Sequence, residues 1–163
     1  MDIKLGCLTY WQQERKKTIE MVDLIPQEHA EYRVSEDTMS FREHVLHLLS
    51  IEFSFIEGLL GKGWDFDRHE GSWRIWEPYQ SEKYVSLSDA KKALQEGTVK
   101  HRELLESLEN WTEPIENPFA PPLPAFMLLQ ILINHENDHR GQLFVYLKQH
   151  GVSVPTPGVY GAD

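Results

Sequence analysis

The chain has 163 residues, a formal net charge of −10, one cysteine and eight histidines. With 16 Lys and Arg against 26 Asp and Glu, it lacks the basic surface that neutralises phosphates, so we expect no nucleic-acid partner. Cys7 alone can form neither an internal disulfide nor a cysteine-rich zinc site, which fits a reducing, cytoplasmic location. No stretch approaches about 18 uncharged apolar residues, so we expect no membrane partner. The length fits a single domain over residues 1–163.

The first half of the chain predicts two helices. The first runs roughly from Leu8 to Leu24, because a proline follows at position 26 and cannot continue a helix. The second begins after Ser40, which forms a capping box with Glu43. Apolar residues then recur at helical spacing until Gly61, which suits a helix end.

The second half predicts two more helices. One begins near Ser86, again with capping chemistry, and continues to about Asn110. A proline-rich bend over residues 114–124 follows. The last helix starts at these prolines, which are tolerated in a first helical turn, and reaches Gly151.

Four amphipathic helices of this length predict an all-α fold, a four-helix bundle. The connection over residues 61–86 is long for a bundle and rich in aromatic residues, which is typical of a loop that covers a site. Its segment Trp73–Trp76 offers a weak strand pattern. Trp73, Trp76 and Tyr79 are candidates for the mouth of a pocket, with ordinary packing as the alternative.

The most informative residues are histidines. His135 and His139 lie four apart, on one face of the last predicted helix, a spacing that suits a shared metal ion. The same spacing also fits two core histidines bonded to backbone or carboxylates. His47 falls within the apolar run of the second helix, and His44 precedes it by one turn and competes for the same role. Three imidazoles from two helices would form a three-ligand site with an open position.

The segment 135–139 also matches H-E-x-x-H, the zinc metalloprotease motif in which the glutamate is the general base. The longer form of that motif requires glycine and histidine where this chain has Gln142 and Val145. No glutamate follows as a third ligand, so a protease is a poor fit. A di-iron bundle needs a second Glu-x-x-His motif, which is missing. Glu136 is therefore a candidate base, with exposure to solvent or pairing with Arg140 as the alternatives.

The remaining polar residues near the motif have less specific signals. Asp138 and Gln142 are candidates to hold the imidazole N–H groups of metal ligands, with surface salt bridging or helix packing as the alternative. We expect Cys7 to have no role in the chemistry. The other four histidines show no partners in the sequence and are expected at the surface, namely His29, His69, His101 and His150.

The chain resembles the DinB/YfiT-like superfamily over nearly its whole length. Two segments carry the resemblance: Phe41-Arg42-Glu43-His44-Val45-Leu46-His47-Leu48-Leu49 and Asn134-His135-Glu136-Asn137-Asp138-His139-Arg140-Gly141-Gln142-Leu143. The resemblance implies an up-down-down-up bundle. It also implies that His47, His135 and His139 hold a divalent metal ion. Nickel and zinc are the first candidates for this ion, followed by iron and manganese.

The resemblance further implies a metal-dependent enzyme with a small-molecule substrate. Relatives include transferases and an isomerase that use low-molecular-weight thiols such as bacillithiol and mycothiol, and proteins described as metal-dependent hydrolases. Because Cys7 is the only cysteine, any thiol in the chemistry would come from outside the chain. Two other hypotheses stay open: a non-catalytic, stress-related metal-binding bundle, and a structural bundle without metal. A homodimer is compatible with each.

Overall fold

The structure is a computed structural model that describes residues 2–64, 79 and 83–155. It confirms the predicted all-α bundle of four helices, joined by a short 3-10 helix and a pair of two-residue strands. In chain order the elements are α1 Ile3–Asp23, η1 Gln27–His29, α2 Phe41–Leu59, α3 Leu87–Ser107, β1 Pro114–Ile115, β2 Leu123–Pro124 and α4 Ala125–Gln149.

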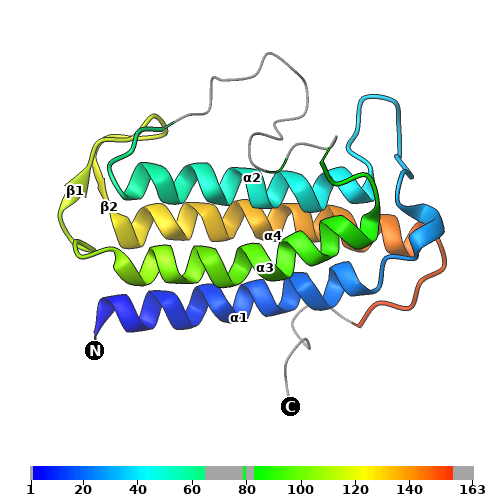
Figure 1. Ribbon diagram of the computed structural model, residues 1–163, viewed down its shortest axis with the longest axis horizontal. Coiled ribbons are helices and arrows are strands. Elements are labelled where there is room, and N and C mark those ends of the chain that lie inside the picture. Colours follow the sequence, from blue (N-terminus) through cyan, green and yellow to red (C-terminus); the bar gives the residue numbers. More distant parts are fainter. Residues whose placement is uncertain (1, 65–78, 80–82, 156–163) are drawn as a thin grey trace.

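The helices have the up-down-down-up arrangement (Figure 1). α1 and α4 run in one direction and contact each other, while α2 and α3 run in the opposite direction and also form a contacting pair. Two neighbouring parallel helices cannot be joined by a tight turn. The chain between them must return along the bundle, a length of roughly 30 Å for a helix such as α3. The direction of α3 therefore explains why the connection after α2 is long.

The predicted capping boxes start α2 and α3. Ser40 Oγ accepts a hydrogen bond from the Glu43 amide at 3.2 Å, and the Ser40 amide donates to Glu43 Oε2 at 2.8 Å. Ser86 and Asp89 repeat this exchange at 3.0 and 3.2 Å. Each pair satisfies amides that a helix start leaves without partners.

Several predicted boundaries shift in the structure. α1 begins at Ile3, earlier than the expected start, because Asp2 caps it by accepting from the Leu5 amide at 3.2 Å. α3 ends at Ser107, before the expected end. The proline-rich bend contains the antiparallel strands β1 and β2, which the sequence did not predict. The candidate strand at residues 73–76 lies outside the described residues.

The core has two apolar halves with a buried polar layer between them. One half joins the end of α1 and of α4 to the beginning of α2 and of α3, around Phe41 and Leu147. The other half joins the opposite ends, around Trp11 and Leu128. Between them, near the middle of the helices, lie buried polar and charged residues, among them Arg15, His47, Glu52, His101, Glu136 and His139.

Within the described part of the chain, none of the helices combines the length and apolar character needed to span a bilayer.

Candidate metal centre

Three histidine rings meet between α2 and α4. His47 comes from the middle of α2, and His135 and His139 lie one turn apart on α4. The Nε2 atom of His135 is 3.3 Å from Nε2 of His47 and 3.1 Å from Nε2 of His139. Among the described residues these three form a group whose ligand atoms all lie within 4.8 Å of one another. The structure thus brings together the three histidines that the sequence proposed as metal ligands.

Two of the three histidine rings, those of His135 and His139, have lowered pKa values that favour the neutral form. Burial lowers the pKa of His135. Burial and the neighbouring rings of His47 and His135 lower the pKa of His139 to about 3. Metal ions bind the neutral imidazole, so these two rings are in the binding form at neutral pH without having to release protons.

The geometry of the three rings fits a divalent ion. Ligand nitrogens at about 2.0–2.1 Å from a tetrahedral ion lie about 3.3 Å from one another, close to the two observed separations. The Nε2 atoms are the nitrogens that meet, and that of His135 lies close to both of the others. Three neutral imidazoles whose nitrogens face one another cannot satisfy every nitrogen lone pair by mutual hydrogen bonds. A cation at their centre would accept one lone pair from each ring.

His44 is placed differently from the other three. Its Nδ1 lies 3.0 Å from the Ser40 carbonyl oxygen, and its Nε2 lies 2.9 Å from Oε1 of Gln142. Both ring nitrogens are therefore engaged, and the ring packs against His139 with centroids 5.4 Å apart. The structure thus favours His47 over His44 as the third member of the cluster. Gln142 and Asp138 are both exposed, and the Gln142 side chain contacts His44 beside the cluster.

Glu136 does not face the three histidines as a free base. Its side chain is 2% exposed, and its Oε2 lies 3.1 Å from Nη2 of Arg15 on α1. Arg140, the pairing partner considered from the sequence, binds Glu14 instead at 2.6 Å. Both alternatives for Glu136, solvation and pairing with Arg140, are thus wrong. The residue lies about 60° around the helix beyond His139, and at that angle it meets α1.

Glu136 belongs to a second buried cluster, which we call the ion network: Trp11, Arg15, Glu52, Tyr79, His101 and Glu136. Arg15 Nη2 lies 2.6 Å from Oε1 of Glu52. The same Glu52 oxygen accepts from the Trp11 indole N–H at 2.7 Å, and its other oxygen pairs with Nδ1 of His101. Although burial alone would raise the pKa of Glu52, Arg15 and His101 lower it to about 2. Glu52 is therefore a carboxylate with several partners.

His101 corrects an expectation. The sequence placed it at the surface, but it is fully buried, and its Nε2 lies 3.3 Å from the Tyr79 hydroxyl. Gly97, one turn earlier on α3, leaves the space for this contact, because a Cβ there would lie 3.0 Å from that hydroxyl. Tyr79 is buried, so it does not line the mouth of a pocket as proposed. His29 and His150 are partly buried at the end of α4, and His69 lies outside the described residues.

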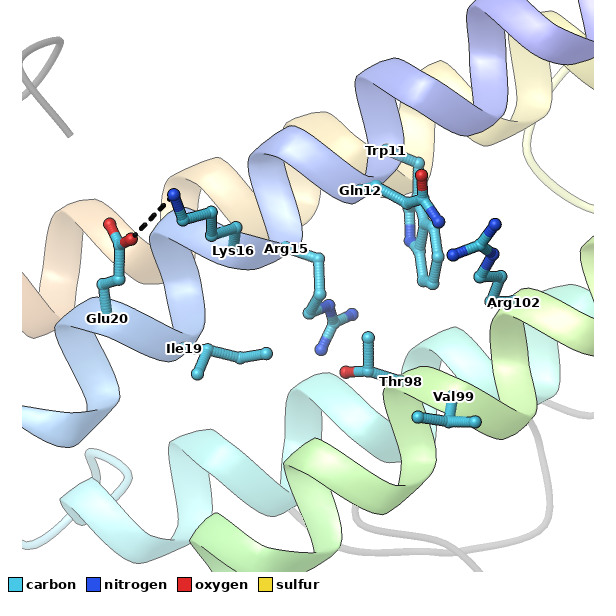
Figure 2. A pocket seen from close by; sticks show the side chains of 9 residues that line it. All are labelled: Trp11, Gln12, Arg15, Lys16, Ile19, Glu20, Thr98, Val99 and Arg102. Carbon is cyan, nitrogen blue, oxygen red and sulfur yellow. Dashed lines mark ion pairs between the residues drawn. The ribbon is translucent and has the colours of Figure 1, made fainter. Parts of the chain in front are cut away.

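Figure 2 shows the groove through which the ion network approaches the surface between α1 and α3. It has a volume of about 580 Å³, and Arg15 reaches from α1 toward α3 at its base. Its rim carries an exposed ion pair between Lys16 and Glu20 at 3.6 Å. The groove thus lies between a different pair of helices from the histidine cluster.

A second cavity, of about 260 Å³, opens directly beside the histidine cluster, and we call it the histidine pocket. Its walls are His47, Ile51, Phe55, Phe119, Ile131, Leu132 and His135. Phe119 comes from the loop between β1 and β2, which sequence reasoning did not connect with the site. A pocket at an open side of three ligands is where a small substrate would approach an ion.

The sequence profile of the DinB family matches residues 1–161 of the chain. YjoA of Bacillus subtilis strain 168, an uncharacterized protein, is 27% identical over 146 residues, or 88% of each chain. YrdA of the same organism, also uncharacterized, is 49% identical over 45 residues, which are 28% of this chain and 26% of YrdA. These matches are to proteins whose names state no activity.

Two solved structures share the fold. A DinB-like protein from Bacillus cereus ATCC 10987 aligns with a TM-score of 0.70 and 24% identity, over 92% of this chain and 94% of that chain. The crystal structure of YjoA from Bacillus subtilis, also a DinB-like protein, gives a TM-score of 0.69 and 24% identity over 92% and 95%. At this level of identity, the likeness to both structures supports the bundle architecture and carries no information about substrate.

Proposed function

The chain belongs to the DinB family, and on that premise we propose that it is a metal-dependent enzyme whose divalent ion is held by His47, His135 and His139. The observation that carries the proposal is the convergence of three imidazole nitrogens beside an open pocket. Three protein ligands with an open position are typical of catalytic rather than structural zinc. Imidazole ligands suit zinc, nickel and iron(II) better than manganese, which prefers oxygen ligands.

We further propose that the reaction is a thiol transfer or a hydrolysis. When bound, a divalent ion supplies the acidity that turns a thiol or a water molecule into a nucleophile near neutral pH. The three imidazoles fix the position of the ion, and the apolar walls of the histidine pocket exclude bulk water from the reacting groups. The thiol comes from outside the chain, because Cys7 lies on α1 and not in the cluster.

Glu136 has no catalytic part in this proposal. Its Oε2 is paired with Arg15, and burial raises the pKa of its carboxyl. A glutamate in this position contributes to the packing of α4 against α1. The ion pair between Glu136 and Arg15 also supports the alternative function, a metal-binding protein without catalysis. In H-E-x-x-H enzymes this glutamate is the general base, and here Arg15 binds it.

The test is to load the protein with zinc, nickel or cobalt(II) and to record the visible spectrum of the cobalt form. Adding a low-molecular-weight thiol such as bacillithiol should change that spectrum, and the loaded protein should then consume a model electrophile. A thiol-dependent change without turnover would favour the non-catalytic alternative. No cobalt binding, with an unchanged spectrum, would contradict the proposal itself.

A further inference from the structure

The histidine pocket has apolar walls apart from the two imidazoles at one end. Its other described walls are Ile51 and Phe55 from α2, Ile131 and Leu132 from α4, and Phe119. A charged group that enters such a pocket loses its hydration, and none of these walls carries a charge that would compensate the loss. A dry apolar cavity of comparable size, by contrast, readily takes a benzene-sized molecule.

Phe119 is held in place over the pocket by its own loop. Asn117 Oδ1 accepts from the amides of Phe119 and Ala120, each at 3.0 Å. Its Nδ2 donates to the carbonyl oxygens of Ile115 and Pro121 at 3.2 and 3.3 Å. One asparagine side chain thus ties the loop to both sides of the turn, so the position of the Phe119 ring is set by the backbone.

The Phe119 ring completes an aromatic wall with Phe55. The two rings are nearly parallel, at 7°, with centroids 5.2 Å apart. Trp64 stands at right angles to both, and its indole N–H donates to the Glu116 carbonyl oxygen at 2.7 Å. Phe119 is 46% exposed. A firmly held aromatic ring that lines a small apolar pocket suits contact with a ligand.

We propose that the histidine pocket takes the uncharged, apolar part of the substrate, an aromatic ring or a hydrocarbon group of similar size, and that Phe119 determines this specificity. The catalytic meaning of this inference rests on the proposed function, since the pocket matters for turnover only if the histidines hold an ion. The recognition itself needs no metal. The volume of the histidine pocket, about 260 Å³, is below the range of pockets for drug-sized ligands. The bound group is therefore limited to roughly one ring.

The test uses three fluorinated probes on the metal-free protein: fluorobenzene, 4-fluorobenzoate and 4-fluorobenzylamine. Binding is measured by fluorine NMR for wild type, Phe119→Ala, Phe119→Leu and Tyr10→Ala. Tyr10 is the matched control, because it is an aromatic residue of similar exposure, 41%, on α1. Thermal melting of each variant checks that it is folded, and Phe119→Leu keeps the bulk of the side chain while removing the ring.

We expect fluorobenzene to bind wild type at least tenfold more tightly than either charged probe. Phe119→Ala should weaken fluorobenzene binding about three- to tenfold, the size of an aromatic contact, with Phe119→Leu in between and Tyr10→Ala unchanged. A charged probe that binds as well as fluorobenzene would overturn the inference, as would Phe119→Ala behaving like Tyr10→Ala.

Metal content, measured on the same variants after loading with zinc, separates the two proposals. Full zinc loading without fluorobenzene binding would refute the pocket and leave the proposed metal site standing. Fluorobenzene binding without zinc loading would do the reverse.

Discussion

The histidine cluster and the ion network are two buried polar regions in the same layer of the bundle. They differ in how the free-energy cost of burying their polar groups is compensated. The ion network contains its own cation, Arg15, which compensates Glu52 and Glu136. The histidine cluster consists of three imidazole rings whose nitrogens face one another. His135 and Glu136 are adjacent in sequence, yet one belongs to each region. The histidine cluster, whose members supply no cation, is thus suited to binding one, whereas the ion network, which includes Arg15, is suited to stabilising the fold.

The largest expected difference is the response to a chelator. A ligand that binds only the native state stabilises it by about 4 kcal/mol when the free ligand is about 1,000 times above its Kd. We therefore expect removal of zinc to lower the melting temperature of wild type strongly and to leave His135→Ala unaffected. Glu136→Gln, the adjacent substitution, should keep the response. If Glu136→Gln lost it and His135→Ala kept it, the division between the two regions would be wrong.

Removing the cation of the ion network should cost nearly as much. Arg15→Ala leaves two buried carboxyl groups, Glu52 and Glu136, without their partner, and such a change typically costs about 3–5 kcal/mol. The measurement is urea unfolding of the metal-free protein. Combining Arg15→Met with Glu52→Gln and Glu136→Gln should recover part of the loss, because no uncompensated charge remains. A loss below about 1 kcal/mol for Arg15→Ala would show that the network is not important for stability.

The ion network should make the free energy of unfolding depend on pH in the acid range. The pKa of Glu52 falls from the ordinary value of 4.5 to about 2 in the folded protein. A depressed carboxyl pKa contributes stability that is present above pH 4.5 and is lost as the pH falls toward 2. The raised pKa of Glu136 acts in the opposite direction. The informative quantity is therefore the difference between wild type and Glu52→Gln, which should shrink below pH 4.5; a constant difference would contradict the assignment.

The smallest effect concerns the packing of Trp64, which stands against Phe55 and Phe119 of the histidine pocket. Alanine is a better helix former than glycine by about 1 kcal/mol, but a Cβ on Gly58 would lie 2.4 Å from the Trp64 ring. We expect Gly58→Ala to lose roughly 1 kcal/mol, because the indole must move. Gly141→Ala on α4 is the control, since a Cβ there meets nothing within 4 Å. Calorimetry should find Gly141→Ala neutral or stabilised; equal behaviour of both variants would argue against tight packing of Trp64.

Much of the fold could be predicted because its signals are local. The capping boxes at Ser40 and Ser86 and the apolar periodicity locate the starts of α2 and α3 within a residue. The position of His135 and His139 on the same face of α4 follows from their spacing of four residues alone. The choice of His47 depends on its place in the apolar run of α2.

The ion network could not be predicted because its members come from separate elements that meet only in the folded bundle. The single available signal was the position of charged residues within apolar stretches, such as Glu52 between Ile51 and Phe53. The angle of Glu136 on its helix could be calculated, but which helix lies there depends on packing. Phe119 illustrates the same limit, because a loop residue has no periodicity that connects it with a site far away in the sequence.

The central claim is that three histidines hold one divalent ion, and metal analysis of the purified protein tests it most directly. We expect one zinc or nickel ion per chain in wild type and in His44→Ala, and loss of stoichiometric metal in His47→Ala, His135→Ala and His139→Ala. Stoichiometric metal that persists in His47→Ala and His135→Ala, or that disappears in His44→Ala alone, would contradict it.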